Sequence, residues 1–150
     1  MKKEDLNYFL TNTLLFNLEQ AARIARISAV HFFDENPQID ISYNDFSIID
    51  AIFINPEIHQ RDLAKLLAKD TANLSRDLER LEKKGILKRI VDTKSNRIVK
   101  KIVLTDFGIK YHQKIANITK QQIENLENVF TQEEKQIFKE FLIRLKNNID

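Results

Sequence analysis

Apolar residues recur every three or four positions along the first part of the chain, which is the spacing of one helix face. The set consists of Leu6, Leu10, Leu14, Leu18, Ala21, Ala25, Ala29 and Phe32. It predicts one long helix over roughly residues 4–34, which Pro37 and the polar residues before it end. A second apolar set widens this face beyond what one short neighbour can cover: Phe9, Phe16, Ile24 and Ile27.

The next segment predicts a second helix that begins after Ser42 and continues to about Ile54. Ser42 and Asp45 have the spacing of a capping box, in which each side chain caps the other residue's backbone N–H group. The pair Asn55-Pro56 then breaks the chain.

Two short helices are predicted to follow. The first starts between His59 and Asp62, and the second runs from the capping residue Asp70 to about Lys84. Gly85 stands at the position where a helix commonly stops. We call the second of these the recognition helix, and its predicted inward stripe is Leu74, Leu78 and Leu81.

After Gly85 the pattern changes from helix to strand. Residues 86–91 and 98–104 are rich in β-branched side chains, and the polar residues 92–97 between them predict a hairpin loop. Thr105 and Asp106 then cap a long helix, and Thr131 with Glu134 forms a capping box for a last one.

The predicted fold class is mainly α with a small β hairpin (α+β). Two short helices followed by a hairpin make a winged helix-turn-helix, in which the second helix enters the DNA major groove. We divide the chain into an N-terminal dimerisation helix (residues 1–40), a winged helix-turn-helix DNA-binding domain (41–104) and C-terminal dimerisation helices (105–150).

The net charge of +2 hides a strong asymmetry along the chain. Residues 59–110 hold 14 of the 24 Lys and Arg residues but only 7 of the 22 Asp and Glu residues. This local excess of +7 is typical of a segment that binds a polyanion. A solvated charged surface with no partner is the alternative that charge alone leaves open.

Other function classes find little support. The chain has no cysteine, which excludes disulfides and a thiol redox switch. His31, His59 and His112 are too far apart for a zinc-ligand motif, so no metal site and no cofactor are expected. No enzyme motif and no run of apolar residues long enough to span a membrane is present, and we expect a cytoplasmic protein that is not an enzyme.

Three segments resemble the MarR family of transcriptional regulators, and together they cover roughly residues 41–108. The segment that opens the family's second helix resembles residues 41–46 (ISYNDF). The family's helix-turn-helix resembles residues 60–70 (QRDLAKLLAKD), 74–76 (LSR) and 81–85 (LEKKG), and its Leu-Thr-x-x-Gly sequence after the wing resembles residues 104–108 (LTDFG).

The resemblance implies a homodimer whose terminal helices interlock and place two recognition helices over a pseudo-palindromic operator. The wide apolar surfaces of the first and last helices independently call for a partner, although a monomer that buries them within itself is the alternative. The resemblance further implies a repressor relieved by a small aromatic effector, although the sequence leaves repression and activation both open. Candidate effector-binding residues are His31, Phe32, Phe46 and Tyr111, and an ordinary aromatic core is the competing interpretation.

The side of the recognition helix opposite the leucines carries the candidate DNA contacts. Arg76 and Asn73 are the candidates for base edges, because arginine pairs with guanine and asparagine with adenine. Thr71 and Ser75 are candidate positioning contacts, and Arg80, on the same side, is a further candidate for DNA contact. In the hairpin loop, Lys94 and Arg97 are the candidates for contacts with the DNA backbone or minor groove.

Two residues depart from the family pattern. Ser95 stands where the family usually has the Asp that braces its wing arginine, here Arg97. Asp77 occupies a position of the recognition helix where apolar residues are usual, and we expect it to face a basic neighbour such as Arg80. A winged-helix module that binds protein instead of DNA remains the alternative function.

Overall fold

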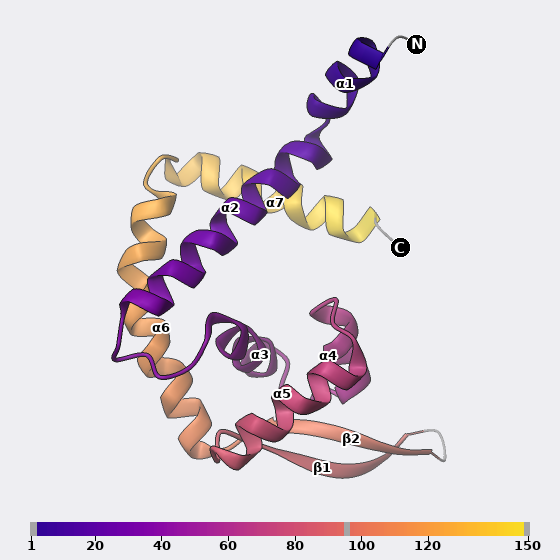
Figure 1. Cartoon of the computed structure of the whole chain (residues 1–150), viewed down its shortest axis with the longest axis vertical. Helices are drawn as coiled ribbons and strands as arrows, with labels where there is room; N and C mark the ends of the chain where they lie inside the picture. The colour runs from indigo at the N-terminus through magenta and orange to yellow at the C-terminus, as the bar shows by residue number, and fades with distance from the viewer. Residues whose placement is uncertain (1–2, 95–96, 149–150) are drawn as a thin grey trace. The chain divides into compact units, whose positions relative to one another are not determined.

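The computed structural model describes residues 3–94 and 97–148, apart from the side chains of Phe9, Lys94 and Arg97. The described residues form seven helices and one two-stranded antiparallel sheet (Figure 1). They belong to two compact units, Met1–Ile109 and Lys110–Asp150. Within the described ranges, no helix combines the length and the apolar character that a membrane crossing requires.

The expectation of one helix over residues 4–34 is wrong, because the structure has α1 (Lys3–Thr11) and α2 (Leu14–Glu35). The apolar period runs on across the break, but the polar side chains there end one helix and start the next. The Thr11 hydroxyl donates to the Asn7 and Tyr8 carbonyls, and the Thr13 hydroxyl accepts from the Phe16 N–H at 3.1 Å. Such side-chain bonds to the backbone compete with helix continuation.

Helices α3 (Tyr43–Ile54), α4 (Gln60–Leu66) and α5 (Thr71–Lys83) form as the sequence predicts. Ser42 caps α3 and Asp70 caps α5, each accepting a hydrogen bond from the backbone N–H three residues on. The core beneath them is aliphatic, since the following side chains are at most 2% exposed: Ile48, Ile49, Ile52, Leu63, Leu74, Leu78, Leu81, Ile86, Leu87 and Ile102.

The hairpin is longer than the sequence suggested. Strands β1 (Leu87–Lys94) and β2 (Arg97–Leu104) pair antiparallel from Leu87↔Leu104 to Lys94↔Arg97. The expectation that residues 92–97 form the loop is therefore wrong, because polar residues 92–94 continue β1. The sheet also bonds to the segment before α4, where the Ile102 N–H donates to the Ile58 carbonyl at 2.8 Å.

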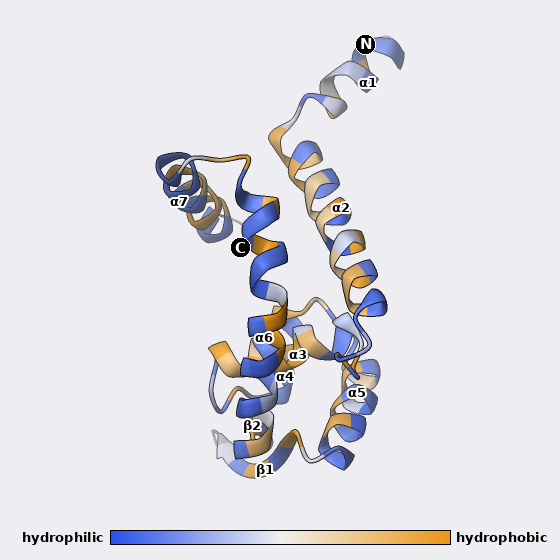
Figure 2. Cartoon of the chain, turned by 90° about the vertical axis from the view of Figure 1, so that its left-hand side faces the viewer, coloured by the Kyte–Doolittle hydropathy of each residue, from blue (hydrophilic) through white to orange (hydrophobic). Residues whose placement is uncertain are grey.

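Helices α6 (Asp106–Glu127) and α7 (Gln132–Asn148) complete the chain. The predicted capping box is present: the Glu134 N–H donates to the Thr131 hydroxyl, and the Thr131 N–H donates to the Glu134 carboxylate. Apolar and polar residues are interspersed along α2 and around α7 (Figure 2). Large apolar side chains about half exposed on α7 are Ile137, Phe138, Phe141 and Ile143.

Candidate nucleic-acid interface

Helix α5 has one buried side and one exposed side, as its leucine spacing predicts. Leu74, Leu78 and Leu81 are fully buried, at 0% exposed. Thr71, Asn73 and Arg76 are exposed on the other side, whereas Ser75 is half-buried. The structure therefore exposes four of the five predicted α5 contacts, Arg80 being the fourth, and it leaves Ser75 partly covered.

Asn73 and Arg76 lie next to each other near the N-terminal end of α5. The guanidinium of Arg76 donates to the Asn73 side-chain oxygen at 3.4 Å. Among the described residues, no carboxylate forms an ion pair with Arg76. Its five N–H donors therefore remain largely available for a base edge or a phosphate.

Arg80, one turn further along α5, is in a different situation. Its guanidinium donates to the carboxylate of Asp45 on α3 and to that of Asp77 on α5, the latter at 2.9 Å. The Asp45 hydrogen bond is the main reason that the pKa of Arg80 lies above its ordinary value. Asp45 thus uses its carboxylate on Arg80, and the reciprocal half of the predicted capping box at Ser42 is not formed.

Asp77 faces basic neighbours, as expected from the sequence. Its carboxylate accepts from Lys69 at 3.0 Å as well as from Arg80, and the Asn44 amide lies at 3.4 Å. Burial by itself raises the pKa of Asp77, but the hydrogen bonds from Lys69 and Arg80 outweigh it and hold that pKa below its ordinary value. The positive charges of Lys69 and Arg80 therefore balance the negative charge of Asp77 in the recognition helix.

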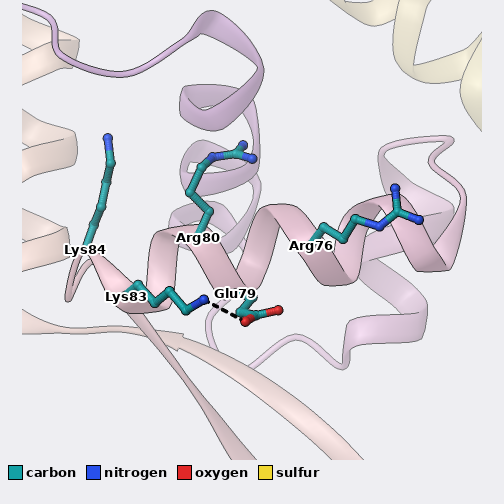
Figure 3. A pocket seen from close by; sticks show the side chains of 5 residues that line it. All are labelled: Arg76, Glu79, Arg80, Lys83 and Lys84. Atoms are coloured by element: carbon teal, nitrogen blue, oxygen red, sulfur yellow. Dashed lines mark ion pairs between the residues drawn. The ribbon is translucent and has the colours of Figure 1, made fainter.

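Basic residues of α5 and of its C-cap Lys84 surround a pocket of about 400 Å³ on the exposed surface, lined by Arg76, Glu79, Arg80, Lys83 and Lys84 (Figure 3). Lys83 pairs with Glu79 at 2.9 Å, and Lys84 donates to the Asp40 carbonyl at 3.3 Å. Arg80 is already paired with Asp45 and Asp77, which leaves Arg76, Lys83 and Lys84 against Glu79, a charge balance that suits an anion such as a DNA phosphate.

A clamp between Glu82 and Arg89 ties the hairpin to α5. Glu82 accepts from the Arg89 backbone N–H at 3.0 Å and from its guanidinium at 2.9 and 2.5 Å. These bonds lower the pKa of Glu82, with the side-chain bond from Arg89 as the largest cause. The sequence analysis missed this pair, and the only available signal was the opposite charge of two residues flanking a helix stop.

A second charged cluster joins the hairpin to the start of α4. The Asp92 carboxylate lies 3.4 Å from the His59 ring and 3.4 Å from the Lys101 ammonium, which also pairs with Glu57 at 3.1 Å. The backbone N–H of Thr93, followed by the His59 and Lys101 side chains, lowers the pKa of Asp92. The aliphatic core holds the two strands at their base, and these charged pairs hold them further toward the tip.

The wing-tip candidates lie at the edge of what the structure describes. Lys94 and Arg97 end β1 and begin β2 opposite each other, but their side chains are outside the described residues. Ser95 is outside them entirely. Contact of Lys94 or Arg97 with DNA stays a prediction.

Three of the four effector candidates lie in the first compact unit. Phe32 and Phe46 are half-buried and flank Phe33, with ring centroids 6.5 and 5.4 Å from it, while His31 is exposed on α2. Tyr111 belongs to the other compact unit. The arrangement around Phe33 is typical of an aromatic core, and an effector site stays a prediction.

Comparisons of the sequence with known proteins match transcriptional regulators. The model of the MarR family matches residues 41–99. The HTH-type transcriptional regulator YybA of Bacillus subtilis is 27% identical over 140 residues, which cover 93% of this chain and 90% of the relative. The regulator YdgJ of the same organism is 32% identical over 114 residues, which cover 73% and 66% of the two chains.

The fold of this chain is also similar to that of a solved DNA-bound protein. The crystal structure of the MepR–DNA complex of Staphylococcus aureus superposes with a TM-score of 0.68 at 23% identity, covering 92% of this chain and 97% of that chain. This likeness confirms the winged-helix fold class that the sequence predicts. At 23% sequence identity, this structural match shows a shared fold and does not show a shared function.

Proposed function

This chain belongs to the MarR family of winged helix-turn-helix transcriptional regulators, and on that premise we propose that it is a homodimeric, sequence-specific DNA-binding protein. In this proposal α5 enters the major groove and the hairpin lies against the neighbouring backbone or minor groove. We assign its action to the cytoplasm, where bacteria such as those of the named relatives keep their DNA.

The observation that carries the proposal is the exposed pair of Arg76 and Asn73 on a helix whose opposite side is fully buried. Arg76 is proposed to pair with a guanine and Asn73 with an adenine, while Thr71 and Ser75 hold the register. Lys83 and Lys84 at the other end of α5, and Lys94 and Arg97 at the wing tip, are proposed to contact the DNA backbone or minor groove.

The proposed second protomer would cover the exposed apolar side chains of the terminal helices. On α2, Leu14 is 87% and Ile24 66% exposed. In the second compact unit, Phe130, Ile137, Phe138 and Phe141 line an apolar pocket of about 210 Å³ together with Glu134. Burying a large apolar side chain is worth about 1.5–3 kcal/mol, so these surfaces favour association.

Light scattering on the parent and on Phe138→Lys tests the dimer. The parent is expected to have twice the chain mass, and the variant is expected to shift toward the monomer because a buried, unpaired ammonium opposes association. A parent that is monomeric at micromolar concentration would exclude the dimer.

We further propose that binding represses transcription and that a small aromatic effector relieves it. A titration of the protein–operator complex with small phenolic and aromatic acids tests the second part. Release of DNA by any of them supports the effector, and retention with all of them argues for a regulator that responds to no such compound.

Titration of duplex DNA at several salt concentrations tests the function itself. If binding neutralises phosphates, the logarithm of the binding constant falls linearly with the logarithm of the salt concentration. The slope is about −0.9 per contacted phosphate. Arg76→Ala is expected to weaken binding of the preferred duplex by about 1–3 kcal/mol and to relax the preference at one base pair. The matched control is Lys139→Gln, which removes one exposed positive charge from α7 and should change little.

A folded parent protein that holds no duplex even at low salt would contradict the proposal and favour the protein-binding alternative. Arg97→Ala is expected to weaken binding with less change in sequence preference than Arg76→Ala. Equal binding by Arg97→Ala and the parent would remove Arg97 from the interface.

A further inference from the structure

Five polar side chains join α5 to α3 and to the turn before α5. Asn44 and Asp45 come from α3, Lys69 from the turn, and Asp77 and Arg80 from α5. Asp77 binds Lys69, Arg80 and Asn44, and Arg80 binds both carboxylates. We call these five residues the α5 lock.

The α5 lock is balanced in charge and largely covered. The side chain of Asp45 is 7% exposed, that of Asp77 15% and that of Lys69 22%, while that of Arg80 is 47% exposed. Two acids face two bases, so neither carboxylate is left without a counter-charge, which would be costly at such burial. The positive charge of Arg80 is in turn offset by two acids.

Apolar packing alone does not fix how α5 is turned about its axis. Leu74, Leu78 and Leu81 press the helix against the core, but hydrophobic attraction is not directional. Hydrogen bonds and ion pairs are directional, and those of Asp77 and Arg80 reach two different elements from one side of α5. The α5 lock therefore fixes the rotation of α5 about its axis, which the leucines alone do not fix.

Small rotations of α5 matter at the DNA surface. Side-chain tips lie about 5–6 Å from a helix axis, so a turn of about 10° moves the Arg76 guanidinium by about 1 Å. A functional group must be held to within about 0.5 Å to act well. Figure 3 shows the Arg80 and Arg76 side chains diverging: Arg80 extends toward α3, and Arg76 extends along the exposed side of α5.

We propose that Arg80 is a positioning residue that sets the rotation of α5 through Asp45 and Asp77, and that base reading is left to Arg76 and Asn73. This inference rests on the proposed DNA-binding function. It assigns Arg80 a different role from the direct DNA contact that its place on the outer side of α5 suggests.

Asp45→Asn tests the inference sharply, because the inference and simple electrostatics predict opposite changes in the affinity for DNA. The carboxylate is buried and cannot touch DNA, and its loss makes the protein less negative, which by charge alone would strengthen binding to DNA. If the α5 lock orients Arg76, Asp45→Asn instead weakens binding of the preferred duplex, by about 3- to 30-fold.

Three further variants complete the experiment. Arg80→Gln should weaken binding at least as much as Asp45→Asn, because it removes the pairs with both Asp45 and Asp77. The double variant should be no weaker than Arg80→Gln alone, because the Asp45 pair is already lost. Arg80→Lys should recover most of the affinity, since an ammonium can still pair with the carboxylates. The salt dependence should keep the parent's slope in all of them, because no phosphate contact is lost.

Arg76→Gln, one turn earlier on the same side, is the matched control and should change the preferred base. Urea unfolding of each variant confirms that titrations are made on folded protein, and affinities are compared only below the onset of unfolding.

Asp45→Asn with unchanged or stronger binding overturns the inference. A salt slope reduced by about one in Arg80→Gln also overturns it, because it would mark Arg80 as a phosphate contact. If the parent holds no duplex, the proposed function fails and the inference fails with it. If the parent binds and Asp45→Asn binds equally well, the inference fails alone.

Discussion

Gly108→Ala should destabilise the junction between the hairpin and α6, because the added methyl has no room. A Cβ atom at residue 108 would lie 1.9 Å from the Ile86 carbonyl oxygen and 2.9 Å from its carbon, where ordinary contacts begin at 3.4 Å. The obstacle is backbone, which has no alternative rotamer. The two segments would have to separate by about 1.5 Å to restore normal contact.

That separation would act on groups already fixed on both sides. The Ile86 carbonyl accepts from the Thr105 N–H at 3.0 Å, and the Gly108 N–H donates to the Thr105 hydroxyl at 3.0 Å. Losing both bonds costs about 2 kcal/mol and overpacking the buried Ile86 costs about 1–3 kcal/mol. Alanine is more favourable than glycine in a helix by about 1 kcal/mol, which offsets part of this cost. The free energy of unfolding is therefore expected to fall by about 2–4 kcal/mol in total.

Urea unfolding followed by circular dichroism measures this loss, with all proteins at one concentration. Gly85→Ala is the control: nothing lies within 4 Å of its new Cβ, but its φ of +72° is unfavourable for alanine. It should cost about 1–2 kcal/mol, less than Gly108→Ala. Equal stability of Gly108→Ala and the parent would show that the close approach to Ile86 has been misjudged.

Three other results are expected. Leu78→Ala should lower the unfolding free energy by about 2–5 kcal/mol, because Leu78 is fully buried, and a loss below 1 kcal/mol would contradict its place in the core. The pKa values of Asp77 and Glu82 lie below their ordinary 3.8 and 4.5, so their stabilising bonds persist above those pH values and are lost as the pH falls through the lowered ones. Acid unfolding of Glu82→Gln should accordingly be shallower than that of the parent, and identical profiles would argue against this linkage. Arg89→Lys should weaken DNA binding more than Lys88→Gln, because a lysine cannot reproduce the forked bond to Glu82 that holds the hairpin.

Local signals sufficed where neighbouring residues decide the structure. The caps at Ser42, Asp70 and Thr131, the helix stop at Gly85 and the inward leucines of α5 all depend on residues within one or two turns. The break at residues 12–13 escaped prediction because the apolar period continues across it, and the interruption is favoured by polar side chains, namely the hydroxyls of Thr11 and Thr13 and the amide of Asn17.

Contacts between distant residues could not be predicted in the same way. Asp45 has the spacing of a capping-box acid, yet its carboxylate binds Arg80, 35 residues away. Ala68 adopts a φ of +49° in the turn between α4 and α5, where no glycine marks the bend. The direction in which Asp77 faces was predictable only because an acid at a DNA surface needs a neighbouring base.

Selection of bound sequences from a pool of random duplexes tests the central claim most directly, namely that the exposed side of α5 and the hairpin read DNA as a pair. The account predicts one enriched motif with two inverted half-sites about one helical turn apart, and a changed or weakened motif with Arg76→Gln. Recovery of the starting pool by folded parent protein, or an identical motif with Arg76→Gln, would contradict it.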